Sequence, residues 1–185
     1  MATAPLGDRV RIRSARIENG KLLVSVVRAG PGDALCCPGE LADLGWTLAG
    51  GKLTRVEPPG TTGRLSLQTL AETEWVLRAW DLDEPAPAGI EVTLTYQQGA
   101  FAGRSGCNRY TAAAAAGDVS GTVMVSPAAG TLRACPEPQS AVEARFLKQL
   151  GGVRTFGFLL GRLAVSCERE GGGRGTMHFD TREHR

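Results

Sequence analysis

The fold of this chain is decided by residues 103–110, which read Gly103-Arg104-Ser105-Gly106-Cys107-Asn108-Arg109-Tyr110. Glycine suits bends and close approach of two backbones, and asparagine tolerates left-handed geometry and bonds to nearby backbone groups. We therefore expect Gly103 and Gly106 to lie at bends, and Asn108 to cap a tight turn. A second cysteine, Cys135, ends the segment 131–135.

Short strands with glycine and proline turns surround this segment. Apolar residues alternate over 90–96, where Ile90, Val92, Leu94 and Tyr96 share one face of a predicted strand. Residues 74–80, 153–158, 162–168 and 175–180 predict further strands. The alanines at 112–116 are too few to nucleate a helix, so we expect an edge strand or a closely packed loop there.

One helix is expected, over residues 138–150. Val142, Phe146, Leu147 and Leu150 recur at helical spacing, and two glycines at 151 and 152 end the run. Ser140 and Glu143 have the spacing of a capping box, which would explain Glu143 without a catalytic role.

The N-terminal third predicts a small β-meander over residues 1–57. Residues 9–29 read as a hairpin around an Asn19-Gly20 turn, and residues 46–48 and 52–56 as two short strands. So few apolar residues make a thin core. Residues 58–69, rich in proline and glycine, are expected to be a linker to a second domain at 70–181, with a charged tail at 182–185.

The composition excludes several function classes. The 185 residues include 21 basic and 19 acidic side chains, scattered along the chain, which is no footprint for a nucleic acid. No apolar run approaches the ~20 residues that a transmembrane helix needs. With two histidines and no Cys-x-x-Cys spacing, we expect neither a structural zinc nor another cofactor.

The order of these features resembles the META domain, the family that includes the bacterial heat-shock protein HslJ. The resemblance covers about 70–181 and rests on Trp75, on Gly106-Cys107-Asn108 with Tyr110, on Thr131 and Cys135, and on the helix and closing strands that follow. Before the second cysteine the family usually has Met-Met or Met-Ala, where this chain has Arg133-Ala134. Residues 32–38, Gly-Asp-Ala-Leu-Cys-Cys-Pro, are similar to a pattern in bacterial lipoprotein-type domains that precede META domains.

The resemblance implies an α+β, mainly antiparallel β fold, with a curved sheet or partial barrel packed around one helix. It implies association with the cell envelope and with stress responses, and it brings no catalytic residues. A lipid or peptide could then bind between sheet and helix, in an apolar pocket lined by five aromatic residues: Trp75, Tyr96, Phe101, Phe146 and Phe158. The other kind of partner that we expect is another protein of the cell envelope.

The five cysteines leave alternatives open. Our hypothesis is that Cys107 and Cys135 form a disulfide in an oxidising compartment, whereas in a cytosol they would stay reduced. One of Cys36 and Cys37 is expected to bridge to Cys167 or to a cysteine outside this sequence.

A catalytic Cys107 would need a nearby base. His178 alternates with Met177 and Phe179 and is expected to face solvent or the opposite side of the sheet, so we do not expect an enzyme. The alternatives to a non-catalytic binding module are a cysteine-dependent enzyme using Cys107, and a protein inhibitor or assembly partner. Arg104, Arg109 and Arg133 are expected to form a solvated rim around the motif.

The first eight residues lack the basic start and the apolar core of a signal peptide. Two explanations compete. The protein is cytoplasmic, or an export signal has been removed and the protein belongs to the periplasm or cell envelope.

Overall fold

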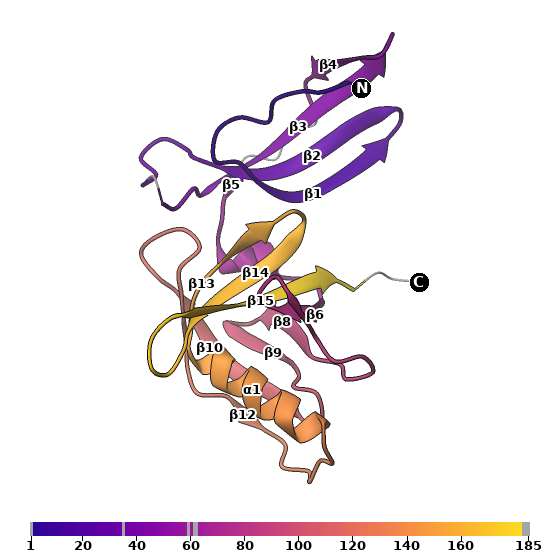
Figure 1. Ribbon diagram of the computed structural model, residues 1–185. Helices are drawn as coiled ribbons and strands as arrows, with labels where there is room; N and C mark the ends of the chain where they lie inside the picture. The colour runs from indigo at the N-terminus through magenta and orange to yellow at the C-terminus, as the bar shows by residue number, and fades with distance from the viewer. Residues whose placement is uncertain (1, 35, 59, 61–62, 183–185) are drawn as a thin grey trace. The chain divides into compact units, whose positions relative to one another are not determined.

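A computed structural model describes residues 2–34, 36–58, 60 and 63–182 of the chain. The chain divides into two compact units. The N-terminal unit holds Met1–Leu65 with the hairpin tip Phe158–Arg162, and the C-terminal unit holds Ser66–Gly157 with Leu163–Arg185. The fold class is α+β with mainly antiparallel strands, as the sequence predicts (Figure 1).

The N-terminal unit is an antiparallel meander. Its strands run in the order β1-β2-β3-β4, with a short β5 on the free part of β3. Their bounds are β1 (Arg11–Glu18), β2 (Lys21–Arg28), β3 (Glu40–Ala49), β4 (Lys52–Val56) and β5 (Gly63–Arg64). The predicted hairpin turn is confirmed, because Asn19 and Gly20 have φ of 50° and 73°. Positive φ at both central residues is the requirement of a type I′ turn, whose twist matches that of the strands.

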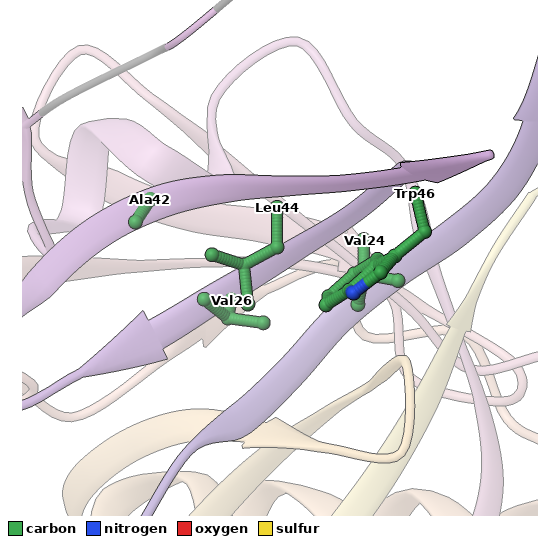
Figure 2. Close-up of a cluster of buried hydrophobic side chains, with 5 residues drawn as sticks. All are labelled: Val24, Val26, Ala42, Leu44 and Trp46. Atoms are coloured by element: carbon green, nitrogen blue, oxygen red, sulfur yellow. The ribbon is translucent and has the colours of Figure 1, made fainter. Parts of the chain in front are cut away.

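One face of this meander carries its core. Val24 and Val26 on β2 lie opposite Leu44 and Ala42 on β3, and Trp46 continues the same face (Figure 2). The shared face follows from the two-residue period of strands. The partly buried apolar residues packed against it come mainly from the N-terminal segment and neighbouring strands, namely Ala4, Leu6, Val10, Ile12, Leu22 and Leu53.

The C-terminal unit is a curved sheet that nearly closes into a barrel. Its strands run in the order β11-β10-β9-β8-β6-β15-β14-β13, with β12 on β10 and β7 on β6. The two ends of this order meet, because Thr122 bridges Thr155 and the N–H of Phe156 donates to the carbonyl of Gly121 at 2.7 Å. The bounds are β6 (Trp75–Trp80), β7 (Glu84–Pro85), β8 (Thr93–Gln97), β9 (Ala100–Arg104), β10 (Arg109–Ala116), β11 (Val123–Val125), β12 (Ala129–Gly130), β13 (Val153–Leu159), β14 (Arg162–Glu168) and β15 (Arg174–Thr181).

The predicted helix is α1 (Gln139–Gly151). Its apolar stripe of Val142, Phe146 and Leu150 is buried. The ring of Phe146 meets that of Tyr110 on β10 edge to face, with centroids 5.1 Å apart. A capping box at Ser140 is wrong: the residue at the N-cap is Pro138, with no side-chain cap. The glutamate that the box would use, Glu143, accepts a hydrogen bond from the backbone N–H of Asn108 instead.

The alanine run is a strand, but not an edge strand. It belongs to β10, which pairs with β9 on one side and with β11 and β12 on the other. Tyr110, Ala112 and Ala114 are buried while the alternate residues are exposed, so the strand period, not helix propensity, decides the segment.

Part of the segment 58–69 is regular structure. β5 pairs with β3, and a 3-10 helix η1 (Leu67–Leu70) follows, with Leu67 and Leu70 buried. Residues 59, 61 and 62 lie outside the described residues, as do residues 183–185 of the tail.

Candidate functional site

The Gly106-Cys107-Asn108 turn is joined to the segment before α1 by a disulfide bond. Cys107 and Cys135 are bonded, with their Cα atoms 6.2 Å apart, within the usual range for a disulfide. The two cysteines are 28 residues apart in sequence, so the bond closes a long loop that contains β10, β11 and β12. Neither cysteine is free to act as a thiolate in this state.

The carboxamide of Asn108 holds the segment 131–134 (the display segment) against this turn. Its Oδ1 accepts hydrogen bonds from the hydroxyl of Thr131 at 2.7 Å and from the N–H of Arg133 at 3.0 Å. Its Nδ2 donates to the carbonyl of Arg133 at 3.1 Å. Asn108 is 5% exposed, and it does more than cap a local turn: it binds a segment 25 residues away.

A carboxylate from the helix lies beneath Asn108. Glu143 Oε2 accepts from the backbone N–H of Asn108 at 2.8 Å and also from the hydroxyl of Ser105. Glu143 Oε1 accepts from Asn108 Nδ2 at 2.9 Å. Ser105 is fully buried, and both its N–H and its Oγ lie within hydrogen-bond distance of the Asn108 carbonyl. Glu143 therefore satisfies donors of the turn and is not a helix cap.

Burial and hydrogen bonding act in opposite directions on Glu143. Burial raises the pKa of the carboxyl, but the hydrogen bonds from Ser105 and Asn108 favour the ionised form more strongly, so the net pKa is lowered. Glu143 is thus a carboxylate at neutral pH, bound by its donors and unsuited to act as a general acid there.

This shift predicts an acid-sensitive C-terminal unit. A carboxyl whose folded pKa lies below its unfolded value, about 4.3, stabilises fully above that value and loses the contribution as pH falls through the folded pKa. We expect the urea midpoint of wild type to fall more steeply from pH 5 to pH 3 than that of Glu143→Gln, because only wild type has the Glu143 carboxyl. The other carboxyls with a lowered pKa are present in both proteins and affect both curves equally. Parallel curves would contradict the role given to Glu143.

The other motif residues support the backbone of the turn. Gly106 has φ of 112°, and a Cβ there would lie 3.3 Å from Val142 of the helix. A Cβ on Gly103 would overlap the carbonyl oxygen of Thr93. Both glycines are therefore at a bend or a close approach, as expected. Tyr110 is buried, donates to the Thr93 carbonyl at 3.0 Å, and has its pKa raised by burial.

The arginine rim is exposed at Arg104, Arg109 and Arg133. Arg133 is also tied to the turn, because its guanidinium donates to the carbonyl of Cys107 at 3.1 Å.

The expected pairing of the remaining cysteines is wrong, and one of the two places expected for His178, facing solvent, is wrong as well. Cys36 and Cys37 are bonded to each other, and Cys167 is a free, buried thiol on β14. His178 is 4% exposed, so it does not face solvent. The register shift between His178 and Phe179 leaves Arg78 of β6 as the extra residue, so His178 still alternates with Met177 and Phe179 along β15.

The five aromatic residues expected to line a pocket are largely core residues. Trp75, Phe101, Phe146 and Phe158 are at most 5% exposed, and Tyr96 is half-buried against Phe101, with ring centroids 5.7 Å apart. Phe158 belongs to the N-terminal unit and the others to the C-terminal unit. A surface hollow of about 450 Å³ lies at the end of α1 and is lined by other residues, among them Lys148 and Arg169.

Among the described residues, no group of three or more His, Cys, Asp and Glu side chains is arranged to hold a metal ion. Within the same part of the chain, no helix is long and apolar enough to span a bilayer.

The turn, its disulfide and the helix that supports it lie inside a stretch that matches a known family. The model of the META domain matches residues 68–179, more than half of the chain. The chain belongs to the META domain family. The C-terminal unit is accordingly called the META unit below, and its family is not known as a family of enzymes.

Among solved structures, the chain is similar to a protein from Burkholderia xenovorans whose structure was determined by NMR. The identity is 26%, the match covers 70% of this chain and 99% of that one, and the TM-score is 0.48. A search of curated proteins found no match.

Proposed function

We propose that this chain is a non-catalytic, disulfide-stabilised module of the cell envelope, of the stress-associated, HslJ-like kind, which binds a peptide or protein partner through its display segment. The observation that carries the proposal is the way in which Leu132 is held. Leu132 is 98% exposed, while Thr131 and Arg133 on either side are both bonded to Asn108.

A single exposed leucine is ordinary on a protein surface. Leu132 differs because its flanking backbone is fixed by a buried amide and, three residues on, by the disulfide of Cys135. A loop that is rigid before binding loses less conformational entropy on binding, which favours recognition. Leu132 and the neighbouring exposed Arg133 would offer an apolar contact beside a cation.

The cysteine pairing supports an exported protein. Four of the five cysteines are in disulfides, and disulfides persist in oxidising compartments such as the periplasm. A lipoprotein-like N-terminal unit would fit the same location.

A lipid ligand in an internal aromatic pocket has less support than a peptide at the display segment. Four of the five aromatic residues that would form such a pocket are packed in the cores of the two units, and Tyr96 is half-buried. A cysteine-dependent enzyme also has less support, since the Cys107 sulfur is bonded and Asn108, Glu143 and Ser105 are bonded mainly to one another.

The test is partner capture with a matched pair of surface variants. Wild type, Leu132→Ser and Leu82→Ser would be crosslinked in cell-envelope preparations and their bound proteins quantified. Leu82 is also in the C-terminal unit and 79% exposed, so its substitution removes an equivalent apolar side chain elsewhere. We expect Leu132→Ser to lose its specific partner by about tenfold or more, the effect of an interface anchor, while Leu82→Ser keeps it.

Equal capture by all three proteins would contradict the role of the display segment. Binding of wild type to lipid vesicles, unaffected by Leu132→Ser, would favour the lipid alternative instead.

A further inference from the structure

The N-terminal unit carries a disulfide between two adjacent residues. Cys36 and Cys37 are bonded with their Cα atoms 3.8 Å apart, the spacing of neighbours across one peptide bond. Cys36 is exposed and Cys37 is half-buried, in the loop between β2 and β3. Most disulfides in proteins join residues far apart in sequence, so this pair needs an explanation of its own.

The loop that carries the pair is shaped by Asp33. The Asp33 carboxylate is 3% exposed, and its Oδ2 accepts from the N–H groups of Gly30 and Gly39, each at 2.8 Å. Its Oδ1 pairs with Arg64 on β5. These bonds join the two ends of the loop without help from the cysteines.

The pair therefore contributes little to stability. A disulfide stabilises mainly by restricting the unfolded chain, and more so for longer loops. Cys36 and Cys37 enclose no intervening residue, whereas the Cys107–Cys135 bond spans a sequence separation of 28. A bond that restricts so little and faces solvent is better explained by its chemistry.

The surroundings of Cys36 suit attack by a thiolate. Exposed disulfides are the more easily reduced ones, because the attacking sulfur must reach one of theirs. The guanidinium of Arg11 lies beside Cys36 and is within 3.4 Å of its carbonyl oxygen. A cation at this place attracts an incoming thiolate and stabilises a thiolate that forms there.

We propose that Cys36–Cys37 is a thiol–disulfide exchange site whose co-reactant is a dithiol, either a small molecule or a protein with a Cys-x-x-Cys site. One thiolate of the dithiol attacks Cys36 Sγ, the S–S bond breaks, and Cys37 leaves as a thiolate. The second thiol of the dithiol, as a thiolate, then attacks the dithiol sulfur that is bonded to Cys36. This S–S bond breaks, and Cys36 leaves as a thiolate. The dithiol becomes a disulfide, and the chain gains two electrons and two protons as two thiols.

The experiment is a titration of the folded, oxidised protein with dithiothreitol, with trapping by an alkylating reagent and peptide mapping. The Cys107–Cys135 bond in the same molecule is the internal control. We expect half-reduction of Cys36–Cys37 at a dithiol concentration at least about tenfold lower. Reduction of the two bonds in parallel, reduction of Cys36–Cys37 last, or isolation of both residues as free thiols would each overturn the proposal.

Variants separate this role from a structural one. Cys36→Ser/Cys37→Ser should unfold within about 2 °C of wild type, since almost no loop entropy is lost; a large drop would show that the bond is structural. Arg11→Gln should slow reduction about two- to threefold at low ionic strength, whereas Arg16→Gln, which removes a cation from the same strand, should not. An equal rate in Arg11→Gln would remove Arg11 from the site.

Discussion

Replacement of both Cys107 and Cys135 by serine is expected to lower the free energy of unfolding of the META unit by about 3–4 kcal/mol. The bond spans a sequence separation of 28, and the chain-entropy model gives about 3.5 kcal/mol for a loop of this size. For a unit of this length, such a loss lowers the melting temperature by roughly 15 °C. Thermal unfolding followed by circular dichroism would measure it.

The control is Cys36→Ser/Cys37→Ser, which removes the same number of sulfur atoms but no long loop. A fall of less than about 1 kcal/mol for the Cys107 and Cys135 double variant would mean that Asn108 and Glu143 hold the turn without the disulfide. The bond would then be incidental to the stability of the META unit.

Glu143→Ala should have the other large effect, a loss of about 3 kcal/mol. The substitution leaves the buried N–H and Nδ2 of Asn108 without their carboxylate acceptor, at a cost of about 1–3 kcal/mol for each unsatisfied donor. Glu143→Gln keeps one acceptor oxygen but turns an N–H₂ group towards a donor, so a smaller loss of about 1–2 kcal/mol is expected. Urea unfolding would place the three proteins in this order.

Glu170→Ala provides the matched control. Glu170 is a largely exposed glutamate that pairs with Lys148 at the surface, and its removal should change stability by no more than about 0.5 kcal/mol. If Glu143→Ala were as mild as Glu170→Ala, the carboxylate would not be the support of the turn that its contacts indicate.

The sequence was informative wherever local chemistry decides structure. The Asn19-Gly20 turn, the helix with Phe146 on its buried stripe, and the bends at Gly103 and Gly106 all follow from short-range patterns. The curved sheet was predicted from the resemblance to the META domain, because no local pattern in the sequence indicates it. Each of these predictions needed only residues close together in the chain, or an order of motifs along it.

The predictions that were wrong concern contacts between residues far apart in the sequence. Glu143 lies three residues after Ser140, which is the spacing of a capping box, and nothing local reveals that its carboxylate instead binds Asn108, 35 residues earlier. Three cysteines apart from the motif allowed several pairings, and only the fold shows that Cys167 is buried in β14 while Cys36 and Cys37 share an exposed loop.

The Cys107–Cys135 disulfide and the hydrogen bonds between Glu143 and Asn108 stabilise the same loop. The disulfide restricts the loop in the unfolded chain, and Glu143 with Asn108 satisfies the buried polar groups of the same loop once it is folded. Both serve to fix the display segment, on which Leu132 is exposed. This explains why a cysteine between glycine and asparagine is part of a scaffold here.

The most direct test is the state of Cys107 and Cys135 in the native protein. The protein would be recovered from its own cells under conditions that block free thiols at once, digested without reductant, and mapped by mass spectrometry. We predict a linked peptide pair joining Cys107 to Cys135, in a cell-envelope fraction. Free, alkylated thiols at both positions would contradict the disulfide-stabilised envelope module proposed here.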